Sequence, residues 1–156
     1  LEDGRKLIFI RHAYAPGNGD PAGFNLNDCS TQRNLSDDGR KQAQRIGEFF
    51  TKNKIEIDKV LSSEWCRCKE TAKIAFKDYS TNSFLNSFYS SKFSKNKDKQ
   101  VKAFNYYIKN LEIEKNLIFV THYVFISEVL NYGPSSGEIV VSDKNLNIIG
   151  SIEIDF

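Results

Sequence analysis

The chain has 156 residues, 40% of them apolar and 27% charged, a composition typical of folded globular proteins that excludes a disordered chain. This length predicts a single domain over residues 1–156. No apolar run approaches the ~20 residues of a membrane-spanning helix, and a net charge of +2 is too balanced for a nucleic-acid-binding protein.

The first predicted strand is the apolar run Leu7–Ile10, which lacks polar alternation and therefore indicates a strand buried on both faces. It ends at Arg11 and His12. The stretch that follows, Ala13–Asn34, contains three glycines and two prolines and predicts a long loop. Loops beyond about 12–15 residues are usually functional in compact domains.

Two helices are predicted around a second strand. Ser36 is placed to cap the first helix, whose apolar stripe includes Ala43 and Phe50. Gly39 inside that helix indicates close packing, because a helical glycine costs about 1 kcal/mol relative to alanine. The second strand is predicted within 55–61, and a helix is expected from about Glu64 to Phe76.

The second half of the chain repeats this alternation. Residues 77–98 show no clear period and are predicted to be mostly loop, whereas 99–111 carry apolar residues at helical spacing. A third buried strand, Leu117–Val120, ends at Thr121-His122. A short helix is expected over Tyr123–Leu130, stopped by the Gly-Pro pair that follows.

Two further strands, at 139–141 and 148–154, flank the turn residues 143–145 and predict a C-terminal hairpin. Strands that alternate with helices favour a parallel sheet covered on both faces. The expected fold class is therefore a three-layer α/β/α fold with a mainly parallel central sheet and a C-terminal edge hairpin.

The chain contains only two histidines, and both directly follow a strand of similar sequence. One segment reads Leu-Ile-Phe-Ile-Arg-His and ends at His12; the other reads Leu-Ile-Phe-Val-Thr-His and ends at His122. Ligands of open α/β sheets bind at the carboxyl ends of the strands. We therefore expect both imidazoles to lie in one crevice rather than to be two unrelated structural histidines.

Three of the six arginines are placed to accompany these histidines. Arg11 adjoins His12, Arg67 lies in the first turn of a predicted helix, and Arg33 closes the long loop. A helix N-terminus favours an anion, and an inward-pointing guanidinium is costly unless an anion pairs with it. This arrangement predicts a phosphoryl-transfer site with histidine as nucleophile. The other three arginines (Arg5, Arg40 and Arg45) are expected on solvated faces.

Four short motifs occur in the order found in one family. They are Arg11-His12-Ala13; Leu35-Ser36 with Gly39 and Gln42-Ala43; Ser62-Ser63 with Arg67 and Thr71-Ala72; and Val120-Thr121-His122. The chain thus resembles the histidine phosphatase superfamily, which has the phosphoglycerate mutase-like fold. The resemblance implies that His12 is phosphorylated and that Arg11, Arg67 and His122 form the phosphate pocket.

The sequence departs from the family at the proton donor. The family's usual glutamate has no counterpart in Leu85–Phe88, and Tyr123 rather than an acid follows the second histidine. The candidate donor is Asp20 in the long loop, with Asp28 in reserve, although both also suit ordinary loop turns. Asn18, six residues after His12, is a candidate phosphate contact together with Arg33.

These residues predict a metal-independent phosphohydrolase that acts through a phosphohistidine intermediate on a phosphomonoester or phosphohistidine. It would be a histidine acid phosphatase-type enzyme without a cofactor, and the short chain favours hydrolysis over mutase chemistry. Its partner would be a small phosphorylated substrate or a phosphoprotein. One alternative is a catalytically weak or inactive module of the same fold that only binds phospholigands. Another is a metal site built from the two histidines with a cysteine or aspartate, which the neighbouring Arg11 disfavours.

Three cysteines are too few for a disulfide scaffold. The default expectation is three small buried thiols, while a bridge from Cys29 to either Cys66 or Cys68 stays open. The chain begins at Leu1 without a methionine, so both a cytoplasmic and a periplasmic or secreted location remain open.

Overall fold

The computed structural model describes residue 1 and residues 3–156. Its central sheet has six strands: β1 (Leu7–Arg11), β2 (Ile57–Ser62), β3 (Ser80–Thr81), β4 (Asn116–Thr121), β5 (Ile139–Ser142) and β6 (Ile148–Ile152). The strand order is β3-β2-β4-β1-β5-β6. The first four strands in this order are parallel, and β5 and β6 form an antiparallel hairpin at the edge beside β1. This is the predicted fold class.

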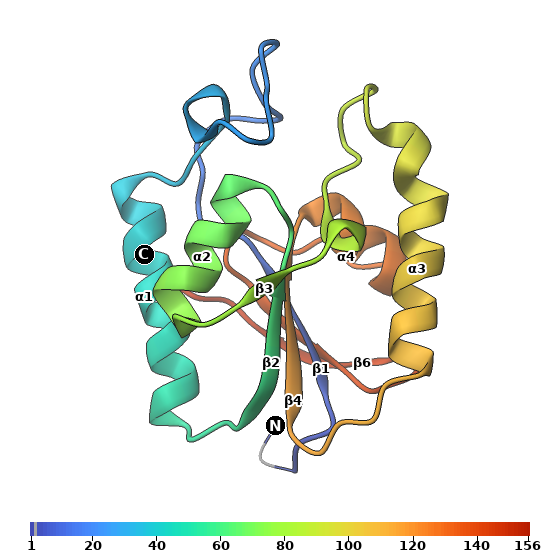
Figure 1. Cartoon of the computed structure of the whole chain (residues 1–156). Coiled ribbons are helices and arrows are strands. Elements are labelled where there is room, and N and C mark those ends of the chain that lie inside the picture. The colour runs from blue at the N-terminus through green and yellow to red at the C-terminus, as the bar shows by residue number, and fades with distance from the viewer. Residues whose placement is uncertain (2) are drawn as a thin grey trace.

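Four α-helices cover the sheet: α1 (Asp37–Lys52), α2 (Cys66–Phe76), α3 (Lys97–Lys109) and α4 (Tyr123–Leu130). Figure 1 shows α1 and α2 on one face and α3 and α4 on the other. The side chains of β1 alternate accordingly. Leu7 and Phe9 pack with Phe104 of α3, whereas Ile8 and Ile10 pack with Ile46 of α1. The predicted doubly buried strand is therefore confirmed.

The N-terminus of α1 is capped at Ser36, as the sequence predicts. The Ser36 side chain accepts a hydrogen bond from the Gly39 amide, and Asp37 and Asp38 lie in the positively polarised first turn. A Cβ built at Gly39 would lie 2.0 Å from the backbone oxygen of Tyr14. Glycine is therefore required where the helix touches the chain just after His12, as its cost within a helix indicated.

The segment 77–98 is mostly loop, as predicted, but it contributes more to the core than a solvated loop would. It holds β3 and two short 3₁₀ helices, Ser83–Leu85 and Ser94–Asn96. Phe84, Leu85 and Phe88 are buried against the α3 side of the sheet. A third 3₁₀ helix, Cys29–Thr31, lies in the long loop.

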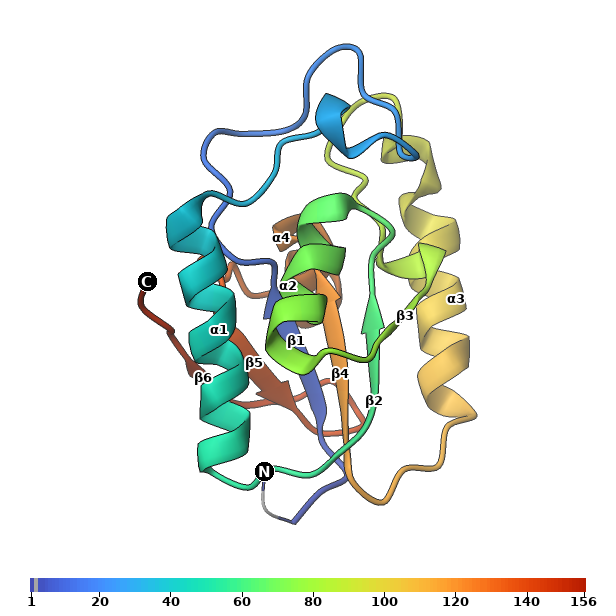
Figure 2. The ribbon, with the colours of Figure 1, turned by 60° about the vertical axis from the view of Figure 1, so that its left-hand side comes forward.

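Both long connections rise above the carboxyl ends of the parallel strands. Figure 2, turned by 60°, shows the loop after β1 and the segment before α3 at this same end of the molecule. The site is therefore formed by strand ends below and by these two connections above. No helix in the part of the chain that the structure describes is long and apolar enough to span a membrane.

Candidate active site

A cavity of about 510 Å³ opens at the carboxyl ends of β1 and β4. Its walls come from the long loop, the start of α2, the start of α4 and the segment 87–93. All seven site residues predicted from the sequence line this cavity: Arg11, His12, Asn18, Asp20, Arg33, Arg67 and His122. β1 and β4 are parallel neighbours with Arg11 opposite Thr121, so the histidine that follows each strand enters the same space.

His12 presents an unprotonated ring nitrogen to Arg67. Its Nδ1 lies 2.9 Å from the Ala13 carbonyl oxygen, which can only accept, so Nδ1 carries the hydrogen. Nε2 in turn accepts a hydrogen bond from Arg67 Nε at 3.2 Å. Burial, together with the charge of Arg67, lowers the pKa of His12 well below 6.5. The imidazole is therefore neutral at pH 7, the state that a nucleophile requires.

Arg67 occupies the first turn of α2, as predicted, and its side chain is buried. Besides His12, it contacts Asp20, because its Nη1 donates to Asp20 Oδ1 at 2.8 Å. The helix N-terminus adds its own positive potential at this position. Arg67 thus links the predicted nucleophile to the predicted proton donor.

His122 lies beside His12, with ring centroids 5.7 Å apart. Its Nε2 is 2.8 Å from the Ser63 hydroxyl. That hydroxyl accepts from the Trp65 amide and contacts the side-chain oxygen of Asn86. Ser63 and Asn86 therefore orient the second imidazole, a role that the sequence reasoning did not assign. The Ser62-Ser63 pair that precedes α2 is the sequence feature from which this role could have been inferred.

Arg11 leans over the ring of Tyr123, 5.4 Å from its centroid, and donates to the Pro134 carbonyl at 3.0 Å. Its Nε is buried and is the one buried side-chain polar atom without a hydrogen-bond partner in the described residues. Burial lowers the pKa of Arg11. An anion beside this guanidinium would offset the cost of leaving it under-satisfied.

Asp20 is held by three donors. Oδ1 accepts from Arg67 and from the Arg33 amide, and Oδ2 accepts from Trp65 Nε1 at 3.0 Å. Burial alone would raise the pKa of Asp20, but the charge and hydrogen bond of Arg67 outweigh it and lower the pKa. Asp20 is the only carboxylate that lines the cavity among the described residues.

The remaining loop residues differ in what they contact. The Arg33 guanidinium donates to the Gly19 carbonyl at 2.7 Å and to the Ala15 carbonyl, so it braces the loop as well as lining the cavity. Burial lowers the pKa of Arg33 to about 10. Asp28 accepts from the amide and hydroxyl of Ser30 and does not line the cavity, so its contacts are those of a loop-turn residue.

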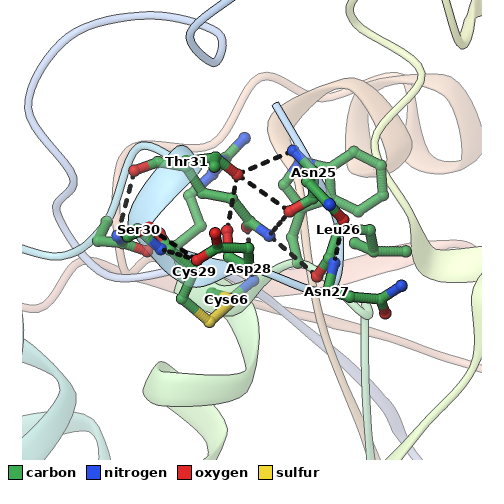
Figure 3. The surroundings of a disulfide bond; sticks show 12 residues. Asn25, Leu26, Asn27, Asp28, Cys29, Ser30, Thr31 and Cys66 are labelled. Carbon is green, nitrogen blue, oxygen red and sulfur yellow. Dashed lines mark hydrogen bonds between the residues drawn. A yellow bond between two sulfur atoms is a disulfide. The ribbon is translucent and has the colours of Figure 1, made fainter. Parts of the chain in front are cut away.

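The expectation of three free thiols is wrong for two of them, because Cys29 and Cys66 form a disulfide (Figure 3). The bond ties the long loop to the first residue of α2, beside Arg67. The two cysteines are 37 residues apart in the sequence. In the chain-entropy model, a crosslink over this separation stabilises the fold by about 4 kcal/mol, because it restricts the unfolded chain. Disulfides form and persist in oxidising environments.

Cys68 is free and buried, with its sulfur 3.5 Å from His122 Nε2. Burial raises the pKa of this thiol to about 12, so it stays protonated and is a poor nucleophile. The described part of the chain has no group of three or more histidine, cysteine or acidic side chains placed to hold a metal ion.

The two buried histidines should make stability depend on pH. The pKa values of His12 and His122 are both lowered, first by burial and then by Arg67, so the unfolded chain binds protons near pH 6.5 that the folded chain does not. The unfolded state then holds more protons, and the free energy of unfolding falls as pH drops below 6.5. Urea denaturation should show a fall of up to about 1.4 kcal/mol per pH unit for each histidine. If the free energy of unfolding of His12→Asn depended on pH as steeply as that of the wild type, His12 would not be one of the groups responsible.

Solved structures with the same fold include three that cover most of this chain. The phosphoglycerate mutase of Thermus thermophilus is 16% identical, with 96% of this chain and 99% of that one covered and a TM-score of 0.64. A candidate α-ribazole-5′-phosphate phosphatase of Escherichia coli is 16% identical, with 87% of this chain and 89% of that one covered and a TM-score of 0.63. A candidate phosphohistidine phosphatase, SixA, of Agrobacterium tumefaciens is 17% identical, with 96% of this chain and 98% of that one covered and a TM-score of 0.59.

At these identities the likeness establishes the fold alone. No curated protein sequence matches the chain significantly. The family model of the histidine phosphatase superfamily, branch 1, matches residues 7–84, which is half of the chain and includes His12 and Arg67. The described fold is also that of the phosphoglycerate mutase, as the motifs predicted. The chain therefore belongs to branch 1 of the histidine phosphatase superfamily.

Proposed function

We propose that the protein is a metal-independent phosphohydrolase that acts on a phosphomonoester or a phosphohistidine through a phosphohistidine intermediate. The observation that carries this proposal is the pair of contacts at His12. Nδ1 donates to a carbonyl, which leaves a lone pair on Nε2, and Nε2 faces Arg67 in a cavity with two further arginines. A neutral nucleophile surrounded by guanidiniums is suited to attack a phosphoryl group.

In the first step, Nε2 of His12 attacks phosphorus, and the bond from phosphorus to the leaving oxygen breaks. The guanidiniums of Arg11 and Arg67, together with His122, stabilise the charge on the equatorial oxygens. Asp20 gives its proton to the leaving oxygen. In the second step, water attacks the phosphorus, the Asp20 carboxylate takes its proton, and His12 is released with inorganic phosphate.

Asp20 must be protonated when the substrate is bound, although its pKa is lowered in the free protein. The lowering comes from the ion pair with Arg67. A phosphoryl dianion bound to Arg67 would share that positive charge and add negative charge beside the carboxyl group. Both changes raise the pKa of Asp20, so substrate binding itself favours the acid form.

The phosphohistidine intermediate is directly testable. Brief mixing with a ³²P-labelled phosphomonoester should leave label on His12 that is labile in acid and stable in base, with steady release of phosphate afterwards. Label on Ser62, Ser63 or a cysteine would show that the mechanism is wrong. Label on His12 without steady turnover would instead identify the weak or inactive binding module that the sequence left as an alternative.

A further inference from the structure

The cavity is lined by two kinds of side chain. Its histidines and arginines are charged or polar, whereas five aromatic residues line the same cavity: Phe24, Trp65, Tyr89, Phe93 and Tyr123. The proposed phosphoryl chemistry uses none of these rings as a reacting group. Their arrangement therefore bears on what else the cavity holds.

Three of these rings form one packed cluster. Phe24 stacks on Trp65 with centroids 5.0 Å apart and an interplanar angle of 25°, and Phe93 meets both rings edge-on. Trp65 is fixed by its bond to Asp20, and its ring lies 5.5 Å from that of His122. The aromatic wall thus begins directly at the residues proposed for catalysis.

Two tyrosines, Tyr89 and Tyr123, also line the cavity and are more exposed than these three rings. Tyr89 is 63% exposed and Tyr123 is 45% exposed, so neither side chain is needed for the core. The Tyr89 ring lies against the long loop, since a Cβ at Gly19 would be 3.4 Å from it. The two connections that rise above the sheet in Figure 1 therefore approach each other through Tyr89, an exposed residue that lines the cavity.

We propose that the cavity selects small phosphomonoesters whose leaving alcohol carries a planar aromatic ring, held against the aromatic residues while the histidines and arginines bind the phosphoryl group. This inference rests on the proposed function and adds the substrate class. A volume of about 510 Å³ is within the range of small-molecule sites. Aromatic rings gain binding energy from stacked and edge-on contacts beyond the area that they bury.

The test compares benzyl phosphate with cyclohexylmethyl phosphate. Both leaving groups are primary alcohols with the same carbon skeleton, so ring planarity and aromaticity are the main differences. We expect kcat/KM to be about threefold to tenfold higher for benzyl phosphate, the range that aromatic contacts supply. Equal values, or a preference for the saturated ring, would overturn the proposal while leaving phosphatase activity intact.

Two variants and one control locate the effect. Tyr89→Ala or Phe93→Leu should bring the ratio of the two kcat/KM values toward one, whereas Tyr89→Phe should preserve this ratio. Tyr106, 72% exposed on α3 and outside the cavity, provides the control Tyr106→Ala, which should leave the ratio unchanged. A ratio unaffected in both Tyr89→Ala and Phe93→Leu would contradict the assignment to this wall.

A binding measurement separates this proposal from the proposed function. Benzylphosphonate and cyclohexylmethylphosphonate cannot be hydrolysed, so calorimetry reports their affinity even if the protein turns over neither ester. Tighter binding of the benzyl compound supports the aromatic wall whether or not the protein hydrolyses esters. Equal affinities would reject it independently of any catalytic result.

Discussion

His12→Ala should lower the phosphatase activity by roughly 10⁴- to 10⁶-fold, the scale found when a catalytic nucleophile is removed. The variant should still fold. His12 makes one side-chain bond to backbone, at Ala13, and its imidazole is held neutral in a buried position. Circular dichroism and thermal unfolding check the fold, and steady-state assays with an aryl phosphate check the activity.

Chemical rescue distinguishes a lost nucleophile from a disturbed pocket. Truncation to alanine leaves space beside Arg67, and added imidazole can enter it and attack the phosphoryl group as a free base. Activity should then rise in proportion to the imidazole concentration in His12→Ala but not in His122→Ala, whose imidazole is proposed to stabilise charge. Activity within tenfold of the wild type in His12→Ala would place the nucleophile elsewhere.

The main elements of the fold could be predicted because each is a strong local pattern. Leu7–Ile10 and Leu117–Val120 are continuous apolar runs, and both are central strands. β3 was missed because it has only two residues and pairs only with Leu61 and Ser62. Its existence depends on the neighbouring strand, and no periodicity within two residues can reveal it.

The helix after the second strand begins at Cys66 rather than near Glu64, and this shift bears on the disulfide. Residues two positions apart on a helix point to different sides. Cys66 faces the long loop and bonds Cys29, whereas Cys68 faces inward to His122. Sequence spacing alone could not choose between them, because the choice depends on where the helix starts and how it is rotated.

That the candidate site residues gather in one cavity could be predicted, because topology determines where they meet. Two neighbouring parallel strands, each followed directly by a histidine, bring those side chains together, and an arginine in the first helical turn reaches the same strand ends. Trp65 and Asn86 carry no such signal. Their contacts with Asp20 and Ser63 arise from the packing of loops above the sheet, which a single sequence does not encode as a pattern.

Asp20→Asn should lower the hydrolysis of an alkyl phosphate about 10²- to 10⁴-fold and that of an activated aryl phosphate much less. Positioned acids contribute on this scale, and the contribution matters most when the leaving oxygen is strongly basic. Asparagine retains an oxygen that can accept from Arg33 or Arg67, but it has no acidic proton. Measuring kcat/KM for both esters in the wild type and the variant gives the differential loss.

The control for this measurement is Asp28→Asn, since Asp28 lies in the same loop, is exposed and bonds only to Ser30 through its side chain. Asp28→Asn should change kcat/KM for neither ester. Losing the ion pair between Asp20 and Arg67 also disturbs the phosphate pocket, but that disturbance affects both esters alike, so only the difference between them reports proton donation. Equal losses would mean that Asp20 merely positions Arg67, and no loss on either ester would assign the proton to water.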